Sequence, residues 1–284
     1  MRARDRIQYK TREQIELMRV AGLVVAGALD AVRAALRPGV TTGDLDRIAH
    51  DLIVGRGATP SFLGYGYPPY PATLCVSVND EVVHGIPGLR VLQAGDVVSV
   101  DCGAIVDGWH GDSAFTAVVP ASDGQADPRT PEQIAADDDL IRVTQESMWR
   151  GIAAIVAGER LNSIGAAVED FVGNRYGLVE QYGGHGIGTE MHQDPHVLNY
   201  RTRDRGPRLR PGICLAVEPM LTAGDAATKV LDDEWTVSTV DGQRAAHWEH
   251  SVALLDDGVW VLTAPDGGRA ALADLGAKVS ALAG

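Results

Sequence analysis

The chain has 284 residues, 45% of them hydrophobic, which is enough for one large domain or about two average ones with a substantial core. A formal net charge of −13 argues against a nucleic-acid partner, because phosphate recognition needs clustered Lys and Arg, and we expect no such cluster. The sequence has no run of about 18 apolar residues and opens on charged residues rather than a signal peptide, so it predicts a cytoplasmic protein without a membrane span.

Apolar residues in the first part of the chain recur at helical spacing and predict a core-facing helix. Thr11 and Gln14 form a potential capping box at its start, and Pro38 with Gly39 would end it. The stripe consists of Ile15, Met18, Gly22, Val25, Leu29, Val32 and Leu36. A second helix is expected from Thr41, with inward positions at Leu45, Ile48, Ala49 and Leu52.

The order of elements is expected to occur twice. Loop sequence at 60–71 precedes β-type runs at 74–78 and 96–119, and after a polar loop we expect a helix over 131–156, a second helix led by Ser163, and further strands. Gly95 precedes Asp101 by the same spacing as Gly212 precedes Glu218. The pattern predicts a single α+β domain over 11–262, with pseudo-repeats at about 11–120 and 131–255, flanked by tails at 1–10 and 263–284. Functional residues should gather between the halves.

Two aspartates are expected on one face of a β-hairpin. Asp107 and Gly108 predict a two-residue turn between β-type runs, which places Asp101 opposite Ala114 and on the same face as Asp112. Diagonal neighbours in such a pair lie about 7–8 Å apart at Cα, close enough for their carboxylates to share a cation. Either aspartate alone would more often face water, but an apolar run makes a buried, paired carboxylate the better interpretation.

Two glutamates and a histidine complete this set. Glu218 ends the apolar run "GICLAVEPM", Glu249 lies in "AHWEHSVALL", and His185 lies among glycines in "YGGHGIGTEMHQDPH". Four carboxylates and one imidazole, without a thiolate, suit a pair of divalent ions such as Mn, Fe, Co or Zn. Such a pair would hold a bridging water and polarise a substrate carbonyl. The glycines are expected to bring the backbone around His185 close to metal and substrate.

The three cysteines predict neither a disulfide framework nor a zinc site. Cys75, Cys102 and Cys214 are odd in number and lack Cys-x-x-Cys spacing, so we expect buried thiols. Cys102 follows Asp101 on a strand and must point to the opposite face, which disfavours a covalent cysteine mechanism.

Four segments, in chain order, closely resemble type I methionine aminopeptidases: "SVDCGAIVDGWHGDSAFT", "GGHGIGTEMHQDP", "LAVEPM" and "AHWEHSVAL". The similarity extends from about Thr11 to Leu262. It implies the pita-bread fold, in which two pseudo-symmetric halves around a central antiparallel sheet enclose a dinuclear metal site. It also implies a hydrolase that removes the N-terminal initiator methionine from nascent proteins and peptides, with a preference for a small second residue.

The resemblance assigns roles to the ligands and to two further histidines. Asp101 would bind one ion in a bidentate fashion, and Asp112 and Glu249 would bridge both ions. His185 and Glu218 would complete the coordination of the other ion. The catalytic residues it implies are His84, in "VVHGIP", for the amide nitrogen beyond the scissile bond, and His192 for the scissile carbonyl. Glu218 is the expected proton acceptor, because it is both a ligand and a carboxylate.

An apolar pocket for the methionine side chain is also implied. Compared with the family pattern, "LGYGYPPYPATLC" has about two extra residues and Phe62 replaces a cysteine found in some members, so the choice of Tyr70 over Tyr67 depends on the register. The pocket residues implied are Phe62, Tyr65, Tyr70, Cys75, His84, His192 and Trp235.

The spacing of the motifs favours the short bacterial form. Too few residues separate His192, Glu218 and Glu249 for the helical insertion of type II members, and only a short segment precedes the first helix. The resemblance further implies a monomer, and it makes the ribosome a candidate partner. The metal, Co, Mn, Fe or Zn, stays open at this stage.

Two alternatives stay open on the same fold. Xaa-Pro dipeptidases and creatinases usually carry a large N-terminal domain, for which this chain has no length. A non-catalytic binding protein would lose metal ligands, whereas all five positions carry suitable side chains here.

Overall fold

The computed structural model describes residues 7–283, and its first two helices begin at the capping boxes expected from the sequence. The Thr11 hydroxyl accepts a hydrogen bond from the backbone N–H of Gln14, whose side chain accepts one from the N–H of Thr11, and Thr41 with Asp44 repeats this arrangement. All residues of the predicted stripe from Ile15 to Leu36 are buried. The helices are α1 (Arg12–Ala35), α2 (Thr42–Gly55), α3 (Pro131–Ala153), α4 (Ser163–Val172) and the short α5 (Arg269–Ala273), followed by a 3₁₀ turn, η2 (Ala281–Ala283).

Helix α3 ends at Ala153, three residues before the predicted end at Val156. The Ser163 hydroxyl at the start of α4 donates to the carbonyl of Ala154, which satisfies a group that would otherwise lack a partner at the helix end. The α3–α4 contact, a tertiary interaction, therefore sets this boundary.

A nine-stranded sheet forms the centre of the structure, in the order β1-β4-β5-β14-β9-β7-β8, with β2 paired to β4 and β15 paired to β14. Its strands are β1 (Thr59–Pro60), β2 (Leu74–Val78), β4 (Val97–Val106), β5 (Trp109–Val118), β7 (Gly184–Gly186), β8 (Gln193–Val197), β9 (Cys214–Val217), β14 (Glu249–Leu255) and β15 (Gly258–Val261). Two three-stranded sheets contain β3 (Glu81–Val83), β6 (Gly177–Leu178), β10 (Met220–Thr222), β11 (Thr228–Val230), β12 (Val237–Thr239) and β13 (Ala245–His247).

The predicted hairpin of β4 and β5 is confirmed in its register. Asp107 and Gly108 form the turn with φ of 49° and 80°, and Asp101 pairs with Ala114. Strand β5 then pairs with β14, so strands from the two halves of the chain are neighbours at the centre of the sheet. The structure has the α+β character expected.

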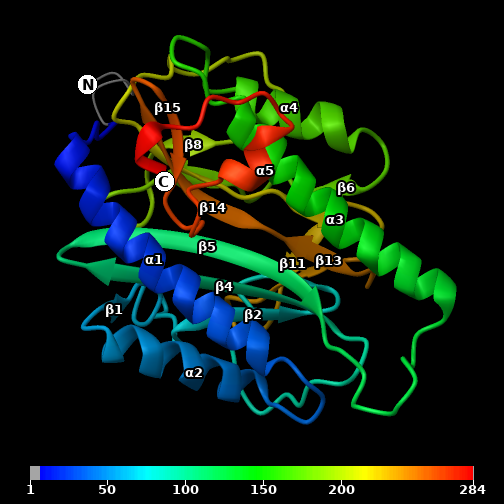
Figure 1. Ribbon diagram of the computed structural model, residues 1–284. Coiled ribbons are helices and arrows are strands. Elements are labelled where there is room, and N and C mark those ends of the chain that lie inside the picture. The colour runs from blue at the N-terminus through cyan, green and yellow to red at the C-terminus, as the bar shows by residue number, and fades with distance from the viewer. Residues whose placement is uncertain (1–6, 284) are drawn as a thin grey trace.

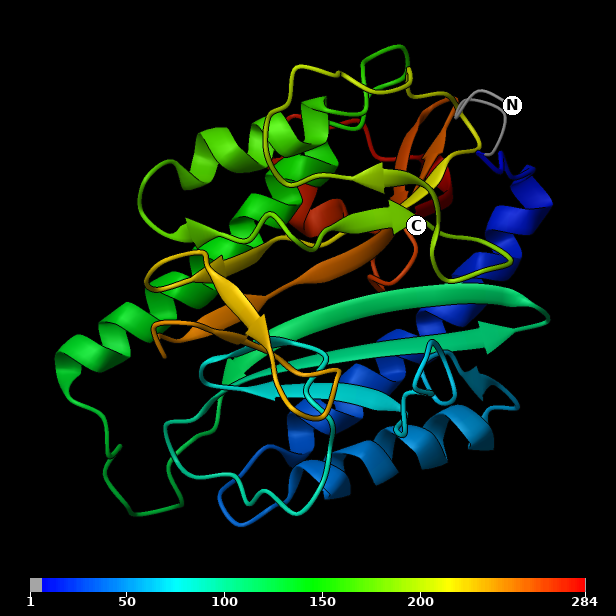
Figure 2. The ribbon, with the colours of Figure 1, turned by 180° about the vertical axis from the view of Figure 1, so that it is seen from behind.

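The helices cover one face of the sheet (Figure 1). Helix α1 packs on β4 and β5, while α3 packs on α4 and contacts β9 and β14. The view from behind shows the strands and connecting loops of the opposite face in front of the helices (Figure 2). Two layers are thus formed, and the side of the sheet away from the helices is free to carry a site.

The C-terminal segment packs against the sheet. Leu272 of α5 is fully buried, and Val279 forms a parallel bridge with Val259 of β15. The division into a domain at 11–262 with tails on either side stays a prediction, and residues 1–6 of the first tail lie outside the described residues.

Three expectations from composition have different outcomes. All three cysteines are free and buried, as predicted, and none of the helices within residues 7–283 is both long and apolar enough to cross a membrane. The expectation that basic residues are not clustered is wrong for one loop, 201–210, which contains five arginines. These are Arg201, Arg203, Arg205, Arg208 and Arg210.

Candidate metal centre and active site

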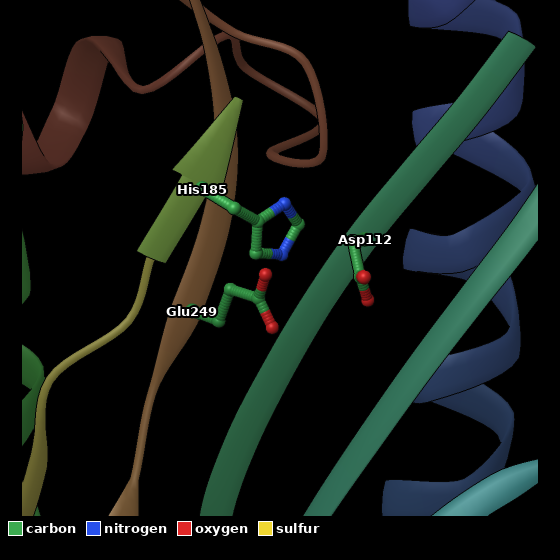
Figure 3. Close-up of side chains that lie close together, drawn as sticks. All are labelled: Asp112, His185 and Glu249. Carbon is green, nitrogen blue, oxygen red and sulfur yellow. The ribbon is translucent and has the colours of Figure 1, made fainter. Parts of the chain in front are cut away.

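The five predicted metal ligands meet on the sheet. Asp101 lies on β4, Asp112 on β5, His185 on β7, and Glu249 begins β14, while Glu218 directly follows β9. Donor atoms of Asp112, His185 and Glu249 all lie within 4.8 Å of one another, and the three side chains converge from three different strands (Figure 3).

Strand register explains why the carboxylates converge. Asp101 and Glu249 are both paired with Ala114, from its two sides, and paired residues in a sheet point to the same face. Asp112 lies two residues from Ala114 on the same strand and shares that face. The small methyl group of Ala114 thus lies amid three carboxylates.

The ring of His185 is oriented by its own loop. Its Nδ1 lies 3.0 Å from the carbonyl oxygen of Gly186, and because a carbonyl can only accept, Nδ1 carries the proton. The unprotonated Nε2 lies 3.4 Å from Oε1 of Glu218. An imidazole held in this tautomer presents Nε2 to a cation.

The site has unpaired buried oxygen atoms that fit a divalent cation. Within residues 7–283, Oδ1 of Asp101, Oδ1 of Asp112 and Oε1 of Glu249 have no hydrogen-bond partner. Burial raises the pKa of Asp101 to about 7, and burial with the neighbouring carboxylates raises the pKa values of Asp112 and Glu249 well above their usual range. Buried carboxylates are costly unless paired or metal-bound, so hard oxygen donors with one imidazole match the chemistry of such an ion.

Two of the glycines around His185 are required by the packing of its strand. A Cβ on Gly184 would overlap the carbonyl oxygen of Ala216 on β9, and one on Gly186 would overlap the carbonyl of Asp194 on β8. These glycines let β7 fit between two neighbouring strands, which places His185 on a strand in close contact with the backbone on both sides.

Replacing Gly184 by alanine is expected to destabilise the protein by about 1–3 kcal/mol, because the added methyl must displace backbone of β9. The midpoint of thermal unfolding measures this effect. Gly55→Ala at the end of α2 is the matched control, since a Cβ there meets nothing within 4 Å and should leave the midpoint unchanged or raise it. Equal midpoints for both variants would contradict the packing role.

A cavity of about 260 Å³ opens beside the carboxylates. Tyr70 is 3% exposed and donates to the carbonyl oxygens of Leu74 and Gly85, whereas Tyr67 is 97% exposed, so the choice of Tyr70 is supported by the geometry. Every residue predicted for the site lines the cavity: Phe62, Tyr65, Tyr70, Cys75, His84, Asp101, Asp112, His185, His192, Glu218, Trp235 and Glu249. The cavity therefore joins an apolar, aromatic wall to an acidic floor.

Two histidines flank the acidic floor in neutral form. Burial lowers the pKa of His84 to about 4, and burial beside His185 lowers the pKa of His192 to about 4. His84 has a φ of 60°, an unusual backbone conformation for a residue with a side chain, and its ring packs edge-on against Tyr182. The Nδ1 of His192 lies 2.6 Å from the hydroxyl of Tyr65.

Sequence reasoning missed two residues of the site. Met191 lines the cavity next to His192, and the glycine-rich segment that contains both could have indicated it. His247 joins Glu218 and Glu249 in a second group of converging donor atoms. Its position two residues before Glu249, which places both on one face of an extended segment, was the available signal.

The sequence matches metallopeptidase family M24 over residues 16–256. The chain belongs to this family. Two M24 relatives are the methionine aminopeptidase 1 of Mycobacterium tuberculosis (strain CDC 1551 / Oshkosh), 49% identical over 93% of this chain and 97% of the relative, and that of Bacillus subtilis (strain 168), 43% identical over 89% and 98%.

Solved structures confirm the pita-bread fold of this M24 protein. The crystal structure of a methionine aminopeptidase from Thermotoga maritima is 39% identical, with a TM-score of 0.82 over 90% of this chain and 99% of that one. A Xaa-Pro dipeptidase from Bacillus anthracis is 21% identical, with a TM-score of 0.69, and it shows a shared fold only. The present chain covers 63% of that dipeptidase.

Proposed function

We propose that the protein is a metal-dependent methionine aminopeptidase that removes the N-terminal, initiator methionine from nascent proteins and peptides. The observation that carries the proposal is the single cavity in which an apolar, thiol-containing wall adjoins the carboxylate and imidazole cluster. An unbranched thioether side chain suits such a wall, and the acidic floor suits the α-ammonium group beside the scissile bond. The names of the relatives support the same activity.

Asp101, Asp112, His185, Glu218 and Glu249 are proposed to hold two divalent cations, with Asp112 and Glu249 shared between them. When bound, these ions lower the pKa of a coordinated water and polarise the substrate carbonyl. Glu218 is proposed to accept the proton of the attacking water. Burial raises its pKa, but the neighbouring His247 and His185 outweigh this and leave the pKa below its usual range, so the carboxylate is ionised and able to accept.

His192 and His84 are proposed to contact the two sides of the scissile amide. Since both imidazoles are neutral, the Tyr65 hydroxyl can donate to Nδ1 of His192, which leaves the proton on Nε2. That Nε2–H would donate to the carbonyl oxygen as negative charge develops on it. His84, which lines the same cavity beside Trp235, would interact with the nitrogen of the leaving amine.

Further parts of the proposal rest on the resemblance to the family: a small second residue in the substrate, a monomeric enzyme, and association with the ribosome. A cytoplasmic location is proposed from the sequence. The metal is proposed to be Co, Mn, Fe or Zn, all of which accept this donor set.

Metal-dependent release of methionine from Met-Ala-Ser, with metal content determined in parallel, tests the proposal. We expect activity with the methionine peptide, loss of activity on chelation, and little cleavage of an Ala-Pro peptide. Preference for the Ala-Pro peptide would instead favour a Xaa-Pro dipeptidase, and stoichiometric metal binding without cleavage of either peptide would favour a non-catalytic binding protein.

A further inference from the structure

His247 is a buried histidine at the edge of the metal centre that is neither a proposed metal ligand nor a proposed contact of the substrate. It is 2% exposed, and its Nε2 has no hydrogen-bond partner within residues 7–283. This nitrogen lies 3.7 Å from Oε2 of Glu218, slightly beyond hydrogen-bond distance. A buried ring nitrogen without a partner needs an explanation, because leaving it unsatisfied costs free energy.

Three contacts hold the backbone of His247 in place. Its N–H donates to the hydroxyl oxygen of Thr116 at 2.9 Å, and the same hydroxyl donates to its carbonyl oxygen at 2.7 Å. It also pairs with Met220 of β10. Trp248 separates it from Glu249, so His247 and Glu249 point to the same side of the extended chain. The imidazole is therefore aimed at the carboxylate cluster by strand structure rather than by a mobile loop.

Glu218 lies between two imidazoles, one for each of its oxygens. Oε1 is 3.4 Å from Nε2 of His185, and Oε2 is 3.7 Å from Nε2 of His247. The two rings differ in what they can do, since the proton of His185 is on Nδ1, which directs its Nε2 lone pair into the site. A ring that carries its proton on Nε2 would instead serve as a donor to the second oxygen.

We propose that His247 is a positioning residue that donates its Nε2–H to Oε2 of Glu218, and so directs Oε1 toward the cation that His185 also binds. A shift of a few tenths of an ångström closes the distance. Donors of this kind orient metal ligands, and their loss typically weakens metal affinity or activity by about 10–100-fold. The inference rests on the proposed metal centre but not on which peptide is cleaved.

The test measures Mn²⁺ binding to chelator-treated full-length protein by calorimetry, together with kcat and KM for Met-Ala-Ser. His247→Leu removes the donor, and we expect Mn²⁺ affinity and kcat to fall about 10–100-fold with little change in KM. His247→Gln keeps an N–H donor of similar reach, and it should restore both to within a few-fold of the unchanged protein. His250→Gln is the matched control, because His250 is partnered by Thr263 and Ser113 rather than by a carboxylate.

Electron spin-echo spectroscopy of the Mn²⁺-loaded protein distinguishes a donor from a ligand by counting imidazoles bound to the metal. We expect one bound imidazole in the unchanged protein and in both His247 variants. Two bound imidazoles in the unchanged protein would overturn the proposal, as would a glutamine variant as impaired as the leucine variant, or a leucine variant with unchanged affinity. Should His247→Leu not fold, the spectrum of the unchanged protein and the affinity of His247→Gln decide the question. Methionine release plays no part in the calorimetry, so failure of the proposed activity would be seen separately.

Discussion

Replacing Glu249 by glutamine is expected to reduce methionine release by about 10³-fold or more, a loss of about 4 kcal/mol of transition-state stabilisation. Glutamine has nearly the same shape but no charge, so the variant should fold while cation binding is lost. Glu249 is 2% exposed, and its Oε1 has no hydrogen-bond partner among residues 7–283. Changing this oxygen therefore breaks no hydrogen bond within the fold. Peptide turnover and bound metal per chain, measured on the same sample, check this expectation.

The unfolding midpoint of the metal-free variant provides an internal check. Because the pKa of Glu249 is raised by burial and by Asp112, the carboxylate destabilises the metal-free protein at neutral pH, and the variant should be at least as stable as the unchanged chain. Glu16→Gln, at an exposed position paired with Arg12 on α1, is the matched control and should keep full activity. Near-normal turnover and metal content in Glu249→Gln would show that Glu249 is not a metal ligand.

Metal-free protein is expected to lose stability as pH rises. Burial raises the pKa of Asp101 to about 7 in the folded protein, whereas an unfolded aspartate has its usual value near 4. Between these values the folded state holds the extra proton, so the free energy of unfolding falls as pH rises through this window. Each pKa unit corresponds to about 1.4 kcal/mol, and Asp112 and Glu249 shift in the same direction. The unfolding midpoint of chelator-treated protein should therefore be lower at pH 8 than at pH 5.

Adding Mn²⁺ at pH 8 should raise the midpoint again, because the cation binds only the ionised, folded site. Glu249→Gln should show a shallower dependence on pH, since one of the interacting carboxylates is gone. A midpoint that is constant or rises from pH 5 to pH 8 without metal would show that the carboxylates are not held together in the folded protein.

Local sequence patterns were sufficient for much of the site. The Asp107-Gly108 turn fixes the register of β4 against β5, and register alone places Asp101 and Asp112 on one face. Capping boxes at Thr11 and Thr41 mark the helix starts because they depend on residues three positions apart. Carboxylates in apolar runs, such as Glu218 and Glu249, could be recognised because burial makes them costly without a partner.

Features that depend on contacts between distant segments could not be predicted in this way. The end of α3 is set by Ser163, and the need for glycine at position 184 is set by Ala216. Met191 and His247 lie beside recognised motif residues, but their inclusion in the site depends on the cavity wall and the carboxylate cluster that distant segments form. The arginines of the 201–210 loop are evident in the sequence, but the expectation about basic residues was based on the net charge of −13, which does not show local clusters.

The junction between β5 and β14 has a mechanical consequence. These strands are in backbone register at two positions, Glu249 with Ala114 and His250 with Ser113, and the side chains of Ser113 and Ser251 add hydrogen bonds between them. Strands β4 and β5, in contrast, are paired along their whole length. Asp112 lies on one side of this narrow junction and Glu249 on the other. A cation held by both carboxylates would link the two strands non-covalently, so its binding would stabilise this junction against local opening.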